Sequence, residues 1–215
     1  MRTIMITLLA LVMAYTTVSA QSADPLQDAV TRLDKAASVK DYEALEKTFS
    51  GIAVSQKTAW LPYYYAAFCN AKIGFLYQDD GERIEPYSKS GEEQAKQAIS
   101  LLNADKQKKE LAEVNTVLSM VYRTRVFINP MTYGRQYGSL SQKHLEQAKQ
   151  LDPQNPRALY VEAWVKYYTP KLWGGDKQRA KQLAEESLAK LPGTAAGVEP
   201  HWGRKEDQEL LAKIK

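Results

Sequence analysis

The feature that most constrains this chain is a spacing of small residues that occurs three times. Each copy has small or medium-sized side chains at offsets 0, 4 and 7, and a Pro or Asn closes it at offset 12. Offsets 0, 4 and 7 fall on one face of an α-helix, where small side chains let a second helix approach closely. The spacing therefore predicts repeated helical hairpins. Its three copies are Gly91, Ala95, Ala98 and Asn103; Ser141, Leu145, Ala148 and Pro153; and Ala180, Ala184, Ser187 and Pro192.

A helix rich in large side chains precedes each copy, and each of these helices carries a small residue followed by a large one. The pairs are Ala67-Phe68, Ser119-Met120 and Ala163-Trp164. Together the two patterns resemble the tetratricopeptide repeat (TPR), a helical hairpin with a period of about 34 residues. The copies here start 39 to 50 residues apart, which indicates enlarged loops.

The resemblance implies an all-α fold, a right-handed superhelical array of about three to four hairpins. We expect one TPR-like domain over residues 21–215, with a degenerate hairpin at its start and a capping helix over residues 205–215. No strand-like alternation of polar and apolar residues occurs.

The first twenty residues have the pattern of a signal peptide. Arg2 precedes an apolar stretch from Ile4 to Ala14, and Val18-Ser19-Ala20 has the small-residue form of a cleavage site. The apolar stretch is shorter than the ~20 residues of a membrane-spanning helix. We therefore expect cleavage after Ala20 and an exported, soluble protein, periplasmic or secreted, without a transmembrane helix.

Capping residues and breakers predict where the helices begin and end. Asp24-Pro25 and Asp176 have the form of helix starts, with Asp as the cap. The remaining predicted segments are a helix from Asp41, a helix over 60–77, a loop over 78–85, a helix opening at Ser90, a helix over 110–127, a loop over 131–138 and a helix over 139–151.

Composition and motifs argue against several classes of function. The 29 Lys and Arg residues are interleaved with 25 Asp and Glu residues, so the formal charge of +4 does not predict nucleic-acid binding. Cys69 stands alone in an apolar helix, which indicates a buried thiol and excludes an internal disulfide. His144 lies in a polar helix, where we expect it to be solvated, and His201 lies in an irregular arm. Neither histidine has metal-site spacing, so we predict no metal, no cofactor, no catalytic residue and no enzymatic activity.

A binding function follows from the resemblance. In TPR-like arrays the first helix of each hairpin lines the concave face. The resemblance places eight residues on this inner wall, which would be aromatic with two cationic groups. They are Tyr64, Phe68, Met120, Arg123, Arg157, Tyr160, Trp164 and Tyr167.

Two functions fit such a wall. The first is a scaffold that binds a peptide or protein partner in an open groove. The second is a component of an envelope transport system that binds a small solute in a closed pocket. The aromatic residues could also belong to the core, and the sequence leaves these alternatives open.

Overall fold

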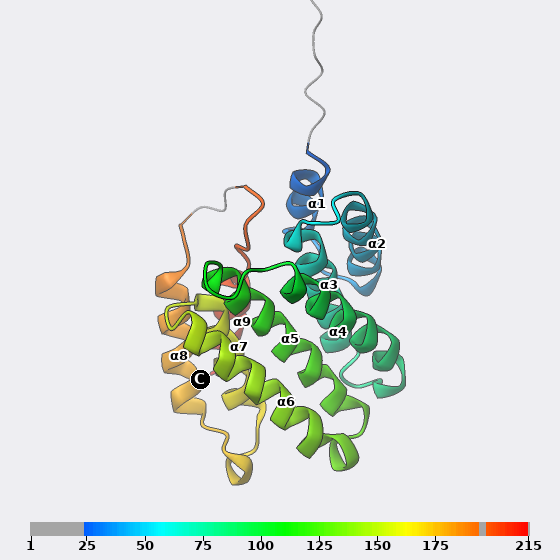
Figure 1. Ribbon diagram of the computed structural model, residues 1–215. Helices are drawn as coiled ribbons and strands as arrows, with labels where there is room; N and C mark the ends of the chain where they lie inside the picture. Colours follow the sequence, from blue (N-terminus) through cyan, green and yellow to red (C-terminus); the bar gives the residue numbers. More distant parts are fainter. Residues whose placement is uncertain (1–23, 194–196, 215) are drawn as a thin grey trace, which may run out of the picture.

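The computed structural model describes residues 24–193 and 197–214. Within these ranges the chain forms nine α-helices and two short 3-10 turns and has no β-strand, which confirms the all-helical prediction (Figure 1). None of the described helices combines the length and apolarity that crossing a membrane requires. The predicted signal peptide lies outside the described residues. The helices are α1 (Pro25–Leu33), α2 (Val39–Ser55), α3 (Trp60–Leu76), α4 (Ile84–Ser100), α5 (Lys108–Ile128), α6 (Pro130–Leu151), α7 (Pro156–Tyr168), α8 (Lys177–Lys190) and α9 (Arg204–Lys213).

The repeated small residues pack between helices as the spacing predicts. All nine residues at offsets 0, 4 and 7 are buried, on α4, α6 and α8. Gly91 shows the reason for small size, since a Cβ placed there would lie 3.1 Å from Cβ of Asn70 and from Cγ2 of Val121. The partner residues Ala67, Ser119 and Ala163 are also fully buried. Close packing of α3 with α4, α5 with α6 and α7 with α8 follows.

The helices α3, α5 and α7 run in the same direction. At their beginnings, Tyr64 on α3 and Arg157 on α7 both contact Glu113 on α5. At their ends, Phe75, Phe127 and Trp164 form aromatic contacts with one another. The turns that follow these three helices therefore lie at one end of the molecule.

Helix caps agree with the sequence where a side chain is available. Asp24 caps α1 through a 3.0 Å bond from the Leu26 backbone N–H, and Asp176 caps α8 through a 2.9 Å bond from the Arg179 N–H. In α2 the cap is Ser38, and Asp41 is the third helical residue, whose carboxylate accepts from the Ser38 backbone N–H. The helix thus starts before the predicted Asp41.

Two further predicted boundaries were wrong. The helix predicted from Ser90 begins at Ile84, and the predicted loop over 131–138 belongs to α6. Asn129 accepts a bond from the Thr132 N–H and Pro130 occupies the first helical position, so α6 starts directly after α5. Gly134 and Gly138 lie in this helix with no neighbouring atom within 4 Å of an added Cβ. Glycine lowers helix propensity by only about 1 kcal/mol, and a well-capped helix tolerates it.

The C-terminal segment folds back over α3 and α7. As predicted, α9 packs on the last hairpin, where Leu210 joins Leu159, Ala163, Leu183 and Ala184 in a small core. The preceding arm reaches the first helices, because Tyr65 Oη donates a 2.6 Å bond to the Val198 carbonyl and Trp202 packs on Phe68. The C-terminal segment therefore covers part of the face formed by α3, α5 and α7.

Candidate ligand cavity

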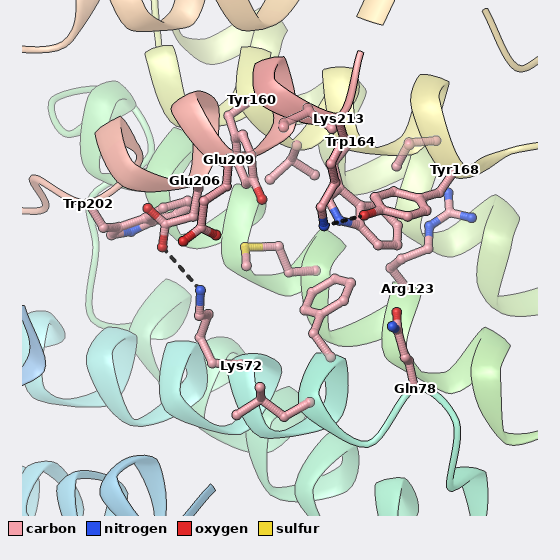
Figure 2. A pocket seen from close by; sticks show the side chains of 16 residues that line it. Lys72, Gln78, Arg123, Tyr160, Trp164, Tyr168, Trp202, Glu206, Glu209 and Lys213 are labelled. Carbon is pink, nitrogen blue, oxygen red and sulfur yellow. Dashed lines mark hydrogen bonds and ion pairs between the residues drawn. The ribbon is translucent and has the colours of Figure 1, made fainter. Parts of the chain in front are cut away.

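A cavity of about 250 Å³ lies between the inner wall and the C-terminal segment. Side chains from α3, α5, α7, α9 and the arm line it, and Figure 2 shows them converging on a common space. Each element contributes a different kind of group: aromatic rings from α3 and α7, a thioether and a cation from α5, and acidic, apolar and basic groups from α9. The cavity exists because α9 and the arm close one side of the space.

Aromatic rings form two opposite parts of the lining. Trp164 contacts Phe75 at 4.9 Å and Tyr168 at 4.5 Å between ring centroids. Trp202 contacts Tyr160 at 6.1 Å on the other side. Rigid rings in such contacts offer a large apolar surface at a low cost in conformational entropy. This part of the cavity suits a flat apolar ligand.

Trp202 is held in place by a hydrogen bond from its indole. Its Nε1 donates to Tyr64 Oη at 2.8 Å, and Tyr64 Oη donates to Glu113 at 3.3 Å. The ring also packs on Phe68 at 4.7 Å between centroids. Trp202 is therefore fixed from both its edge and its face.

Charged groups border the aromatic lining. Lys72 on α3 donates a 3.1 Å bond to Glu206 on α9. Burial alone would lower the pKa of Lys72, but the negative charge of Glu206 outweighs burial, and the pKa of Lys72 is raised. For Glu206 the two effects are reversed: burial would raise its pKa, but the positive charge of Lys72 keeps that pKa lowered. Both groups therefore stay charged near neutral pH and form a fixed ion pair across the cavity.

Two further cations are free to contact a ligand. The Nε of Arg123 is buried and has no hydrogen-bond partner among the described residues, and burial lowers the pKa of this guanidinium. Within the described part of the chain, Lys213 Nζ donates to Tyr168 Oη alone, at 2.9 Å. Figure 2 shows Arg123 beside Tyr168, and Lys213 beside Trp164. Arg123 is only half-buried, with a buried Nε that has no partner in the described chain, and Lys213 is exposed, so both cations are accessible to an acidic group on this side of the cavity.

Four of the eight residues predicted from the sequence line this cavity. Met120 and Arg123 come from α5, and Tyr160 and Trp164 come from α7. They approach one another because α5 and α7 are parallel neighbours.

The other four residues lie elsewhere. Tyr64 and Arg157 belong to a buried network, in which Arg157 donates two bonds to Glu113. Phe68 packs behind Trp202, and Tyr167 lies on α7 outside the lining, where its hydroxyl donates to the Lys213 carbonyl. The repeat pattern assigns positions on a helix, but it does not distinguish core from cavity.

The sequence reasoning missed several lining residues. Lys72, Phe75 and Tyr168 lie on the predicted helices, but at other offsets than those considered, and Leu210 and Lys213 lie on α9. Trp202 follows His201 in the irregular arm, which the repeat pattern does not cover. The sequence does contain a signal for this contact, because an isolated Trp in a polar arm often marks a segment that packs on the domain.

The remaining reactive groups show no site of their own. Cys69 is buried as predicted, and burial raises the pKa of its thiol. His144 is half-buried, not solvated: its ring stacks on Tyr122 and its Nδ1 lies 2.8 Å from Asn115 Oδ1. Burial lowers the pKa of this imidazole. The described residues contain no group of His, Cys, Asp and Glu side chains arranged to hold a metal ion.

A larger hollow of about 540 Å³ lies on the other side of the Lys72–Glu206 pair. It is bounded by α1, α3, α9 and the arm, and the residues it shares with the first cavity are Lys72, Leu76, Trp202, Glu206 and Glu209. His201 closes its edge with a 2.9 Å contact to Asp34. The ion pair and Trp202 thus separate two adjoining spaces.

The fold is similar to that of a solved haemophore. That protein is the HusA haemophore from Porphyromonas gingivalis, with 29% sequence identity and a TM-score of 0.75. The similarity covers 88% of this chain and 90% of the haemophore. No family model and no curated protein matches the chain.

Proposed function

We propose that this protein binds haem or a closely related porphyrin in the cavity between α3, α5, α7 and α9. The observation that carries the proposal is the pairing of a rigid aromatic lining, centred on Trp164 and Trp202, with the unpaired Arg123 and the adjacent Lys213. The similarity to a haemophore over most of both chains supports the same ligand class.

The chemistry of a porphyrin matches these groups. Its flat conjugated ring would pack against the faces and edges of Trp164, Phe75 and Trp202, and its carboxylates would meet Arg123 and Lys213. Arginine and lysine bind carboxylates through charge-assisted hydrogen bonds, and those bonds are strongest where water is excluded. The ligand would thereby supply the anion that Arg123 lacks.

Iron would have few partners in this cavity. The described lining includes no His or Cys; it offers the Met120 thioether, the phenols of Tyr160 and Tyr168, and the carboxylates of Glu206 and Glu209. Burial raises the pKa of Tyr160 well above its usual range, so its phenol stays neutral. Recognition in this proposal therefore depends on the ring and the carboxylates.

The first test compares two tryptophan variants. Titration with haemin and with iron-free protoporphyrin IX should shift the porphyrin absorption band and quench tryptophan fluorescence in the wild type. Trp164→Ala should weaken both affinities by roughly tenfold or more, because an aromatic contact in a desolvated site is a typical hot spot. Trp173→Ala is the matched control, since Trp173 is 73% exposed and lies outside the cavity.

The second test concerns the carboxylates. Arg123→Gln should weaken binding of protoporphyrin IX and leave binding of its dimethyl ester nearly unchanged, because the ester carries no anion. Equal affinities of the wild type, Trp164→Ala and Arg123→Gln, with folding intact, would rule this cavity out as the site.

The peptide-binding scaffold has less support. The inner wall that would form its groove is partly covered by α9 and the arm, where Trp202 packs on Phe68. A partly enclosed cavity, bounded by several helices, favours the small-solute alternative over an open groove. We also propose, as further parts of this function, a TPR-like superhelical arrangement, export through cleavage after Ala20 and a carrier role without catalysis. Intact-mass analysis of protein from the cell envelope or medium should show Gln21 as its first residue.

A further inference from the structure

Exposed apolar side chains gather at one end of the molecule. Within the described residues, six large apolar side chains are strongly exposed, and five of them lie where α3, α5 and α7 end or just beyond. The sixth, Val54, lies near the end of α2 and hence at the opposite end. The five are Leu76, Met131, Tyr168, Leu172 and Trp173.

The two most prominent neighbours in this group are on the turn between α7 and α8, which projects at the lower end of Figure 1. Leu172 is 88% exposed and Trp173 is 73% exposed. Adjacent exposed Leu and Trp side chains are unusual on a surface unless they contact something.

Hydrogen bonds hold this turn in a defined shape. The backbone N–H groups of Trp173 and Gly175 both donate to the Pro170 carbonyl, and Lys166 Nζ donates to the Gly174 carbonyl. Gly174 has a φ of +89°, and a Cβ on Gly175 would lie 1.7 Å from the Thr169 carbonyl oxygen. The backbone is therefore built to keep Leu172 and Trp173 directed outward.

The charge around the turn is positive. Residues 166–181 contain five basic side chains and one acid, Asp176, which caps α8. The basic residues are Lys166, Lys171, Lys177, Arg179 and Lys181. The α3–α4 turn at the same end carries three acids, Asp79, Asp80 and Glu82, against one base, Arg83, so the α7–α8 corner is the more basic of these two turns.

We propose that the α7–α8 turn is a contact site for an anionic lipid surface. Leu172 and Trp173 would enter the interfacial region of the bilayer, where Trp is favoured, and the surrounding lysines would meet lipid phosphates. Tyr168 lies on the rim of the ligand cavity and just before this turn, so lipid contact would bring the cavity close to the membrane. The lipid site stands independently of the porphyrin proposal.

Vesicle binding tests the proposal directly. Protein purified from its producing cell should co-sediment with vesicles of phosphatidylcholine and phosphatidylglycerol (7:3). The bound fraction should be at least about tenfold lower with vesicles of phosphatidylcholine alone. The reason is that each basic group near an anionic surface raises partitioning onto the vesicle about fivefold. Leu172→Ser with Trp173→Ser should lower binding to the anionic vesicles by about tenfold or more. Lys171→Glu with Lys177→Glu should remove the preference for phosphatidylglycerol.

Matched variants separate this site from the cavity. Val54→Ser removes an apolar side chain that is 69% exposed at the other end and should leave vesicle binding unchanged. Trp164→Ala should weaken porphyrin binding but not vesicle binding, and the Leu172/Trp173 double variant should do the reverse. The proposal fails if the wild type binds neither vesicle, in which case a protein partner would explain the exposed turn. It fails equally if the double variant binds anionic vesicles as the wild type does.

Discussion

Arg123 and Arg157 are the two arginines that the repeat pattern places on the inner wall, but they have different surroundings. Arg157 is 9% exposed and donates two hydrogen bonds to the buried Glu113. Burial would lower the pKa of Arg157, but Glu113 outweighs burial and the pKa is raised. Arg123 has no such acidic partner among the described residues. One arginine therefore stabilises the core, and the other remains available to a ligand.

This difference leads to a prediction about stability. Arg157→Gln should lower the free energy of unfolding by about 3–5 kcal/mol, because Glu113 would remain buried without its cation. Arg123→Gln should change it by no more than about 1 kcal/mol, since it breaks no ion pair. Urea unfolding of the two variants measures both values, and equal losses would contradict the assignment of Glu113–Arg157 as a structural pair.

At the scale of elements, the contact between α8 and α9 depends on one proton. Ser187 Oγ lies 2.8 Å from the Pro156 carbonyl and 2.6 Å from Asp207 Oδ2. A hydroxyl has one hydrogen, so both contacts are hydrogen bonds only if Asp207 is protonated and donates to Ser187. Burial raises the pKa of Asp207 to about 7, although Ser187 and Arg204 act to lower it. The acidic neighbour Glu206 raises it further.

The raised pKa predicts how stability depends on pH. The folded state binds this proton up to about pH 7, whereas the unfolded state loses it near pH 4. The contribution of Asp207 to the free energy of unfolding is therefore fully present below pH 4 and is lost as the pH rises through 7. Across this range it is on the order of 2–4 kcal/mol. Asp207→Asn cannot ionise and should flatten the decline in unfolding free energy between pH 5 and pH 8. Chemical denaturation at several pH values checks the slope, and parallel curves for wild type and variant would show that Asp207 titrates normally.

A second prediction at this scale concerns the packing of α4. Gly91→Ala should destabilise the protein by about 1–3 kcal/mol, because the new methyl group would crowd Asn70 and Val121. Gly138→Ala in α6 is the matched control, since no atom lies within 4 Å of the added group. There, alanine should stabilise the helix by roughly 0.5–1 kcal/mol. Thermal melts that moved in the same direction for both variants would contradict the close approach of α4 to α3 and α5.

The elements also show which local signals are reliable. Asp24, Asn155 and Asp176 cap helices through bonds within three residues, and such bonds depend on neighbours in the sequence alone. The predicted start of α4 is too late because Ser90 and the acids after it have the form of a helix start, and the predicted start of α6 is too late because Gly134 and Gly138 indicate a loop. Ser90 and Gly91 lie within α4, where Gly91 allows close packing, and the glycines of α6 are tolerated in the helix.

For the whole molecule, the sequence determined the helical hairpins and their packing faces. Small residues at offsets 0, 4 and 7 act through helix periodicity, which is a local property, so these faces could be read without a structure. The same periodicity could not determine which inner-wall residues meet a ligand. That was decided by the return of the C-terminal segment, which buries Phe68 under Trp202 and adds Leu210 and Lys213 to the cavity with Trp164. Contacts such as Tyr65 to Val198 join residues far apart in the chain, and no spacing within a helix encodes them.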